Sequence, residues 1–398
     1  MRKMLSEKAM EQGKGVLRIV PAWVPRSFCR PGRRIKLHHD DYYALGLTRG
    51  AIDERWFAST TNADNGPGTP PDEGLSYVAV GESGEERILL RDMVEELKGQ
   101  VIGNELYDCY GKWPMFSKYF DNLGPLPHHV HHRSEHAANV GAEGKPEMYF
   151  FPAQMNNHPG EFAFTFFGLN PGTAKEQLKQ VLMSFSKGDN QLLGLSRAYK
   201  LLLDTGWDVP PGILHAPGSL CTYEPQFASD VYAMYQSVLL YEHAVPEALL
   251  WKDCPPDKQG DFDYLVEVLD WEANTAPDFY ERYFMAPKPC GDMNEMLESG
   301  YICEDICYKC ENVRAQRVTV LPGREVMLRD SFAYGAIFIE GYGEIEGQAV
   351  ETPISIRYGA LTNDEFFITG SAAQRGVRVV NHSKTQPLVM LRHYALPI

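Results

Sequence analysis

The sequence predicts a mainly β protein made of two β-domains with helical segments between them, and three observations support this prediction. Short runs of aromatic and β-branched residues recur between Gly, Pro and Asn turns over residues 16–170. The same pattern resumes after residue 301. The chain has 398 residues, which is long for one hydrophobic core, and its 44% hydrophobic content is enough for packed interiors.

The first domain is expected to cover residues 1–238. Strands are predicted at residues 75–80 and 161–167, where aromatic and β-branched residues follow one another, and a short helix is predicted at residues 93–97. Short strands at this density are typical of a sandwich or a barrel. We therefore expect a β-structure whose strands are interrupted by helical insertions.

A longer helical segment is predicted at residues 173–204. Thr173 follows Pro171-Gly172 and is a suitable N-cap, because its hydroxyl can accept a hydrogen bond from a free backbone amide. Apolar residues then recur at helical spacing, namely Leu178, Val181, Leu182 and Phe185. Residues 239–300 are acidic, hold several prolines and include a helical stretch near residues 262–271, so we interpret them as a connector.

The second domain is expected at residues 301–398, which is a common domain size. Its strands are predicted from apolar runs at residues 318–321, 336–340, 366–369, 377–380 and 388–393. Cys303, Cys307 and Cys310 precede these strands in a CxxxCxxC spacing that holds iron–sulfur clusters in some enzymes. No alternating strand–helix barrel is indicated around them, so we interpret them as buried thiols or a fortuitous triple.

Charge and cysteine usage exclude several kinds of partner. The formal net charge of −15 argues against nucleic acid or an anionic membrane. Residues 1–15 are charged and lack the apolar core of a secretion signal, and no apolar run is long enough to span a bilayer. Eight cysteines at irregular positions suggest a reducing compartment. We expect a cytoplasmic protein with no nucleic-acid or membrane partner; the sequence indicates no oligomeric state.

Three histidines can supply ligands for a divalent cation. His129 and His131 are two residues apart, so on a strand they point to the same face. His215 follows Pro210-Pro211-Gly212, a rigid turn that can deliver a third imidazole. Imidazole nitrogen suits zinc, iron, copper or nickel. Five histidines lie within residues 128–136, so a surface cluster without function is the alternative interpretation.

One carboxylate would complete the ligand set. Glu147 lies near the start of a likely strand whose aromatic residues would exclude water. Glu135 is the other candidate, because His129, His131 and Glu135 form an HxHxxxE spacing that also binds metals. On spacing alone both carboxylates stay open.

Further stretches accompany these residues in one order along the chain. They are residues 52–59 (Ile-Asp-Glu-Arg-Trp-Phe-Ala-Ser), 114–121 (Pro-Met-Phe-Ser-Lys-Tyr-Phe-Asp), 126–131 (Leu-Pro-His-His-Val-His), 144–151 (Gly-Lys-Pro-Glu-Met-Tyr-Phe-Phe) and 209–216 (Val-Pro-Pro-Gly-Ile-Leu-His-Ala), followed by Glu224, Gln226, Ser229 and Asp230. In this order they resemble the motifs of the class I mannose-6-phosphate isomerases, zinc enzymes built from cupin (double-stranded β-helix) domains. The resemblance covers roughly residues 50–240.

The resemblance implies a bicupin fold, with two jelly-roll domains, and metal ligands at His129, His131, Glu147 and His215. It therefore favours Glu147 as the carboxylate ligand. Zn²⁺ is the implied cofactor, with Fe²⁺ and Mn²⁺ as alternatives. In the second domain, Ala373 stands where a ligand equivalent to His215 would fall, so we expect that domain to be metal-free.

Lys118 and Lys145 match lysines near the metal in this family and are the implied catalytic residues. A lysine beside a cation can have a lowered pKa and take part in proton transfer. Glu224 and Arg133 are the candidates for substrate binding. Ala233 is a departure, because shorter family members have an arginine at this position, and a guanidinium suits a phosphate. Ala233 therefore bears on whether the substrate carries a phosphate more than on whether the protein binds a metal.

The implied function is an aldose–ketose isomerase acting on a small sugar or sugar phosphate through an enediol(ate), with the cation as Lewis acid. Two alternatives stay open. The same ligands suit iron or manganese, so a cupin oxidoreductase is one. A sugar-binding or regulatory protein without turnover is the other, and Ala233 is its main support.

Overall fold

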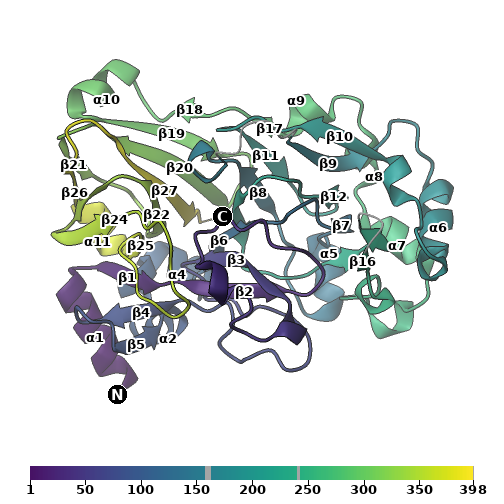
Figure 1. Cartoon of the computed structure of the whole chain (residues 1–398), viewed down its shortest axis with the longest axis horizontal. Coiled ribbons are helices and arrows are strands. Elements are labelled where there is room, and N and C mark those ends of the chain that lie inside the picture. Colours follow the sequence, from purple (N-terminus) through teal and green to yellow (C-terminus); the bar gives the residue numbers. More distant parts are fainter. Residues whose placement is uncertain (157–162, 240–242, 398) are drawn as a thin grey trace.

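Antiparallel strand pairing dominates the chain. The computed structural model describes residues 1–156, 163–239 and 243–397. Within these ranges the strands form sheets of seven, five, nine, four and two strands (Figure 1). The runs of aromatic and β-branched residues form these strands because such side chains pack well on a pleated, half-buried surface. The fold is therefore mainly β with several antiparallel sheets.

The seven-stranded sheet crosses the middle of the molecule (Figure 1). In spatial order its strands are β17 (Phe284–Met285), β11 (Gly206–Val209), β8 (Glu147–Phe150), β13 (Thr222–Phe227), β6 (Met115–Phe120), β3 (Ala51–Phe57) and β2 (Ala22–Arg26). All residues of β6, β8 and β13 are buried. The register pairs Glu224 with Lys118 and Gln226 with Glu147, so three predicted site residues lie on adjacent strands.

The five-stranded sheet supplies the histidines. Its order is β10 (Ser196–Lys200), β9 (Phe164–Leu169), β12 (His215–Ala216), β7 (His129–Val130) and β14 (Ala233–Met234). His215 pairs with His129 across β12 and β7, and directly opposite residues have Cβ atoms about 4.5–5.5 Å apart. β9 corresponds to the strand predicted at residues 161–167, of which residues 161 and 162 lie outside the described ranges.

A nine-stranded and a four-stranded sheet pack against each other. The nine strands, in order, are β18 (Lys288–Pro289), β19 (Tyr301–Cys307), β20 (Val313–Val320), β27 (Leu388–Ala395), β22 (Tyr334–Glu340), β25 (Glu365–Ile368), β1 (Val16–Val20), β4 (Tyr77–Val80) and β5 (Glu86–Leu89). The four are β21 (Glu325–Leu328), β26 (Val377–Asn381), β23 (Tyr342–Ile345) and β24 (Gln348–Glu351), and a separate pair is β15 (Val238–Leu239) with β16 (His243–Ala244). Side chains of both sheets, such as Phe338 and Ile345, share one apolar cluster. Each strand predicted after residue 301 is present.

Strand pairing crosses the predicted boundary between the domains. β1 pairs with β25, with Val16 opposite Ile368, and β4 and β5 continue the sheet beyond β1. Strands from the first ninety residues therefore extend a sheet formed by residues after 288. The periodicity of apolar residues shows that a strand exists but not which distant strand it pairs with. The pairing of β1 with β25 could therefore not be predicted from the sequence.

Helices lie around the sheets, with α6 to α8 gathered at one end of the molecule and α1 and α2 at the other (Figure 1). No helix within the described ranges is long and apolar enough to cross a membrane. The helices are α1 (Arg2–Gly13), α2 (Leu90–Leu97), α3 (Gly99–Ile102), α4 (Asn104–Tyr110), α5 (Ser134–Ala137), α6 (Lys175–Met183), α7 (Phe262–Val268), α8 (Trp271–Thr275), α9 (Phe279–Tyr283), α10 (Met293–Ser299) and α11 (Gly370–Arg375).

The helix predicted at residues 173–204 is much shorter in the structure. α6 ends at Met183, two 3₁₀ turns follow, and residues 196–200 form β10. Gly188 has a φ of 112° and interrupts the helical path, because such an angle lies outside the helical region. The N-cap is Ala174 rather than Thr173, whose hydroxyl donates to the Asn170 carbonyl. The helical stretch predicted near residues 262–271 corresponds to α7 and the start of α8.

Candidate metal centre

Three buried imidazoles come together from two adjacent strands. His129 lies on β7, His215 lies opposite it on β12, and His131 follows β7 directly. One ligand nitrogen of each lies within 4.8 Å of the other two, and each residue is at most 5% exposed. Their neighbours His128 and His132 are buried as well. The alternative of a surface histidine cluster is therefore excluded for these residues.

Backbone carbonyls fix the orientation of all three rings. Nδ1 of His129 lies 2.8 Å from the Pro127 carbonyl oxygen, Nδ1 of His131 2.7 Å from that of Val231, and Nδ1 of His215 2.8 Å from that of Ile213. Because a carbonyl only accepts, each Nδ1 carries the proton and each Nε2 keeps its lone pair. This is the arrangement that metal-binding histidines adopt in proteins.

Glu147, at the start of β8, reaches the same point from the seven-stranded sheet. Its carboxylate oxygens lie 3.1 Å from Nε2 of His131 and 3.1 Å from Nε2 of His215. The Tyr149 hydroxyl donates to this carboxylate. Burial alone would raise the pKa of Glu147, but His131 and Lys145 outweigh it and hold the pKa well below its usual value. A carboxylate anion therefore faces the three imidazoles.

Glu135, the other carboxylate that the spacing allowed, lies elsewhere. It is on α5, its side chain is 60% exposed, and it forms an ion pair with Arg133 at 3.2 Å. The structure thus brings Glu147, and not Glu135, into contact with the imidazoles.

Lys145, Lys118 and Glu224 extend the buried cluster. Lys145 Nζ lies 2.9 Å from Glu147, 3.2 Å from His131 Nε2 and 3.6 Å from Glu224. Lys118 Nζ lies 3.4 Å from the same Glu224 oxygen. Burial lowers the pKa of Lys145, but Glu147 and Glu224 outweigh it and raise the pKa above its usual value. Burial and the neighbouring Glu147 raise the pKa of Glu224 to about 8.

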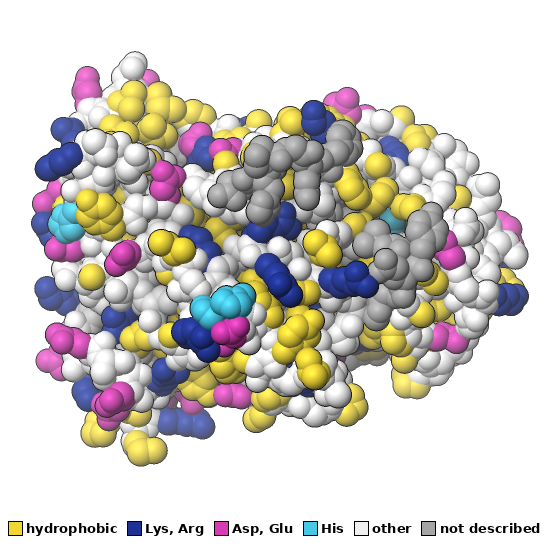
Figure 2. Space-filling view, in the orientation of Figure 1, with side chains coloured by type: hydrophobic (Ala, Val, Ile, Leu, Met, Phe, Trp, Pro, Cys, Tyr) yellow, Lys and Arg dark blue, Asp and Glu magenta, His cyan; other side chains and the backbone are white. Residues whose placement is uncertain are grey.

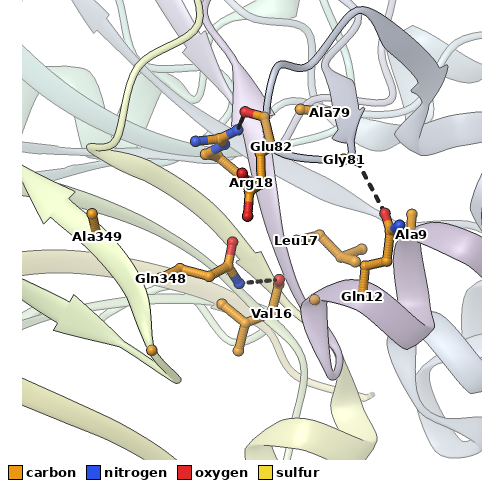
Figure 3. A pocket seen from close by; sticks show the side chains of 12 residues that line it. Ala9, Gln12, Val16, Leu17, Arg18, Ala79, Gly81, Glu82, Gln348 and Ala349 are labelled. Atoms are coloured by element: carbon orange, nitrogen blue, oxygen red, sulfur yellow. Dashed lines mark hydrogen bonds between the residues drawn. The ribbon is translucent and has the colours of Figure 1, made fainter.

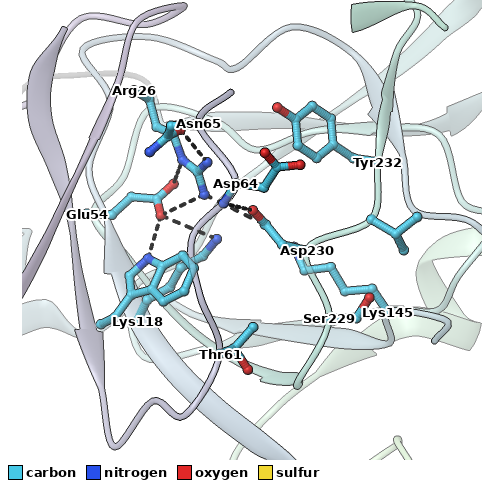
Figure 4. A network of polar contacts seen from close by, with 12 residues as sticks. Arg26, Glu54, Thr61, Asp64, Asn65, Lys118, Lys145, Ser229, Asp230 and Tyr232 are labelled. Atoms are coloured by element: carbon cyan, nitrogen blue, oxygen red, sulfur yellow. Dashed lines mark hydrogen bonds and ion pairs between the residues drawn. The ribbon is translucent and has the colours of Figure 1, made fainter. Parts of the chain in front are cut away.

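Arg26 and Glu54 join this cluster, although sequence reasoning assigned them no role (Figure 4). Arg26 Nε donates to Glu54 at 3.0 Å, and its Nη2 lies 3.7 Å from Asp230. Glu54 in turn lies 3.7 Å from Lys118. Burial raises the pKa of Glu54, but Arg26 and Lys118 outweigh it and lower the pKa to about 2. The signal available in the sequence was the charged pair Asp53-Glu54 within a run that becomes a fully buried strand.

Arg133 follows His131 by two residues, and Ala233 lies on the strand that pairs with β7. Arg133 donates to the Glu267 carbonyl at 3.1 Å and pairs with Glu135, and its side chain is 34% exposed. Ala233 is buried on β14, opposite Val130 of β7. Ala233 therefore lies on the strand beside the strand that carries His129.

The residues present fit a divalent cation. Three imidazole Nε2 atoms and one carboxylate converge, which is a donor set that zinc, iron and manganese accept. The His215 Nε2 atom is buried and has no hydrogen-bond partner among the described residues. Buried polar groups left in this way are costly unless something binds them. A cation held between the imidazoles and Glu147 would satisfy this nitrogen.

The larger described cavities lie away from this cluster. One of about 550 Å³ opens between α1, β1 and the β23–β24 hairpin, and Arg18, Gln12 and Gln348 line it (Figure 3). The Arg18 guanidinium is held by Asn363 and the Glu82 carbonyl. On the surface in Figure 2, acidic and basic side chains are interspersed.

The chain is similar in fold to solved mannose-6-phosphate isomerases. The mannose 6-phosphate isomerase from Bacillus subtilis has a TM-score of 0.63 at 16% identity, covering 96% of this chain and 99% of that one. A variant of phosphomannose isomerase from Salmonella typhimurium has a TM-score of 0.63 at 12% identity, covering 96% and 99%. A zinc-bound mannose 6-phosphate isomerase has a TM-score of 0.61 at 13% identity, again covering 96% and 99%. The chain matches no protein-family model and no curated protein. At these identities the likeness concerns the fold alone.

Proposed function

We propose that the protein is a metal-dependent aldose–ketose isomerase of the mannose-6-phosphate isomerase type, acting on a small sugar or sugar phosphate through an enediol(ate). The observation that carries the proposal is the convergence of His129, His131, His215 and Glu147 with their metal-binding atoms turned inward. The likeness in fold to isomerases of this kind supports it. Zn²⁺ is the proposed cofactor, and Fe²⁺ and Mn²⁺ are the alternatives.

The proposed ligands are the three histidines and Glu147. A bound cation would polarise the sugar carbonyl and the neighbouring hydroxyl and so stabilise the negative charge of the enediolate. The protein contributes fixed orientation, because the carbonyl partners of Nδ1 hold each ring in place. The apolar and aromatic strands around the cluster exclude water.

Isomerisation also needs a group that removes the proton from C2 of the aldose and returns it to C1. We propose that Lys118, Lys145 and Glu224 perform this step together. The Glu224 Oε1 atom lies between the two ammonium groups, at 3.4 and 3.6 Å, and has no hydrogen bond from the described residues. A carboxylate placed there can accept a proton at Oε1, while the lysines stabilise the charge on the sugar oxygens.

Glu224 and Arg133 are the proposed substrate contacts. Glu224 can bind a sugar hydroxyl at the cluster, and Arg133, two residues after His131, has a partly exposed guanidinium. Ala233, on the strand beside β7, offers no charge that could bind a phosphate. Arg133 is therefore the proposed contact for the phosphate of a phosphorylated substrate. A sugar without phosphate is therefore part of the proposed substrate class.

We also propose a bicupin arrangement. Residues 1–238 build the metal-binding barrel, residues 239–300 connect the two barrels, and residues 301–398 form a second barrel without a metal. We propose that the protein acts in the cytoplasm. Ala373, which stands in the second part where a ligand would fall, is fully buried on α11. Strands β1, β4 and β5 modify this division, because they lie within residues 1–238 but belong to the nine-stranded sheet.

Turnover in deuterium oxide tests the function. Zinc-loaded protein is incubated with mannose 6-phosphate, mannose, lyxose and fructose, and proton NMR follows the C1 and C2 signals. An enediol(ate) route predicts ketose–aldose interconversion with deuterium appearing at the exchanged carbon for at least one sugar. The Glu147→Gln variant is expected to lose this activity, whereas His382→Ala, an exposed histidine, is expected to keep it.

A second candidate, a sugar-binding protein without turnover, is favoured by Ala233 alone. It predicts thermal stabilisation by one of these sugars with no exchange at C1 or C2. Absence of both exchange and stabilisation for every sugar would contradict both candidates.

A further inference from the structure

Two cysteines outside the metal centre lie opposite each other at an edge of the nine-stranded sheet. Pro289 of β18 pairs with Glu304 of β19, which places the next residues, Cys290 and Cys303, opposite one another. The Cys290 N–H donates to the Cys303 carbonyl at 2.9 Å, and the two Sγ atoms are also 2.9 Å apart. Opposite residues on antiparallel strands have Cα atoms about 4.5–5.5 Å apart, within the range of about 4.4–6.8 Å that disulfides span. The backbone therefore needs no rearrangement to allow a bond.

The two sulfurs have different surroundings. Cys290 is exposed, whereas Cys303 is only 4% exposed and its Sγ lies 3.8 Å from the Arg392 guanidinium. The contact with Cys290 lowers the pKa of Cys303, burial opposes this, and Arg392 adds to the lowering. The same contact, together with burial, raises the pKa of Cys290. The Arg392 guanidinium is held in place by Gln316 and Asp330. One thiol is thus open to reagents and the other is buried beside a fixed cation.

We propose that Cys290 and Cys303 form a reversible dithiol–disulfide pair that reacts with low-molecular-weight disulfides such as glutathione disulfide. The exposed Cys290 thiol loses its proton to solvent and attacks one sulfur of the small disulfide, so that a mixed disulfide forms and one small thiol leaves. The Cys303 thiolate then attacks Cys290 Sγ and displaces the second small thiol. Two protein thiols and one small disulfide become one protein disulfide and two small thiols, so the two electrons pass to the small disulfide.

The position of the pair gives the bond a structural effect. It would close the segment 291–302, which contains α10, and would fix the end of β18 at the edge of the sheet (Figure 1). Residues 286 and 287 connect β18 to β17, the edge strand of the seven-stranded sheet that carries Glu147. Closing a loop restricts the unfolded chain, so the oxidised protein is expected to melt at a higher temperature than the reduced one.

Thiol titration of the full-length protein tests the proposal. The reduced chain has eight cysteines. The protein is equilibrated with glutathione disulfide, and the reagent is then removed under denaturing conditions that block thiol exchange. Six titratable thiols are expected after this treatment. A non-reducing digest should contain one cross-linked peptide pair holding Cys290 and Cys303. Addition of reduced glutathione should restore eight thiols.

Three variants separate the two steps. Cys303→Ser is expected to stop at the mixed disulfide on Cys290, and Cys290→Ser is expected to form no cross-link. Cys109→Ser, which removes an exposed cysteine on α4, is the matched control and should still form the cross-link. A cross-link that instead joins Cys303 to Cys307 or Cys310, or eight free thiols in the oxidised wild-type protein, would overturn the proposal.

Discussion

At the residue scale, the direction of each imidazole follows from one backbone carbonyl. The rings of His129 and His215 are oriented by the carbonyls two residues before each histidine, and the ring of His131 by the carbonyl of Val231. The sequence could predict the histidines, because their spacing is local. It could not predict the carbonyl of Val231, since that contact joins residues one hundred positions apart.

Removing one imidazole is expected to remove the metal. In His215→Ala the affinity for zinc should fall on the order of tenfold or more, because even the loss of a group that supports a ligand weakens metal binding by about 10–100-fold. Zinc per chain after dialysis, measured by elemental analysis, checks this. The exposed His382→Ala serves as control, and retention of zinc by His215→Ala would contradict the proposed ligand set.

His393 is expected to make stability depend on pH. It is fully buried between Ser117 and Tyr223, and burial lowers its pKa to about 3. The unfolded chain takes up a proton on this histidine near pH 6.5 and the folded chain does not, so stability is lost as pH falls below about 6.5. Between pH 7.5 and pH 5 this one group accounts for a loss of about 2 kcal/mol in the free energy of unfolding.

Denaturant unfolding of His393→Gln at both pH values tests this expectation. The pH-dependent loss should be smaller than in the wild type by that amount, whatever the stability of the variant at pH 7.5. Equal pH dependence in wild type and His393→Gln would show that His393 is protonated in the folded protein.

At the scale of elements, strands were predictable and long-range pairing was not. Strands such as β22 and β27 appear in the sequence as apolar runs because both of their faces are buried. The prediction of one helix over residues 173–204 is wrong beyond Met183. Gly188 and the polar Asp189-Asn190 interrupt the helical path, whereas the spacing of apolar residues alone would extend the helix. The pairing of β1 with β25 could not be predicted from the sequence, because it depends on the strand order of the whole sheet.

One buried ion pair holds β3 of the seven-stranded sheet to the start of β25 in the nine-stranded sheet. Both Arg55 Nη atoms donate to Asp364 at 2.8 Å, and Nη2 also donates to Glu365 at 3.1 Å. Arg55→Met would leave these buried carboxylates without their cation, which costs about 3–5 kcal/mol in the free energy of unfolding. Chemical denaturation measures this loss.

The exposed pair of Arg378 and Glu325 provides the matched control. Arg378→Met is expected to change stability little, because exposed ion pairs are screened by water. A stability of Arg55→Met equal to that of Arg378→Met would contradict the role given to the buried pair.

At the scale of the whole molecule, the metal is expected to be coupled to folding, because its proposed ligands come from two sheets. A cation that binds only the folded chain stabilises it by about 2.7 kcal/mol when its free concentration is 100-fold above Kd. The melting temperature should therefore rise with zinc concentration and fall on chelation. His215→Ala should show a much smaller rise, and an equal rise in both proteins would place the zinc elsewhere.

The fold class and the meeting of the four proposed ligands could be predicted because each rests on local pattern or ordered motifs. The closeness of Arg26, Glu54 and Lys118 could not be predicted, because it depends on the order and register in which β2, β3 and β6 pair. The same holds for Cys290 and Cys303, whose closeness depends on the register of β18 on β19.

Anomalous diffraction from crystals of the zinc-loaded protein, recorded on both sides of the zinc absorption edge, tests the central claim most directly. We expect one strong peak about 2.0–2.2 Å from Nε2 of His129, His131 and His215 and from a carboxylate oxygen of Glu147. A zinc peak at any other position, or none in zinc-saturated crystals, would contradict the claim that these four side chains bind one ion.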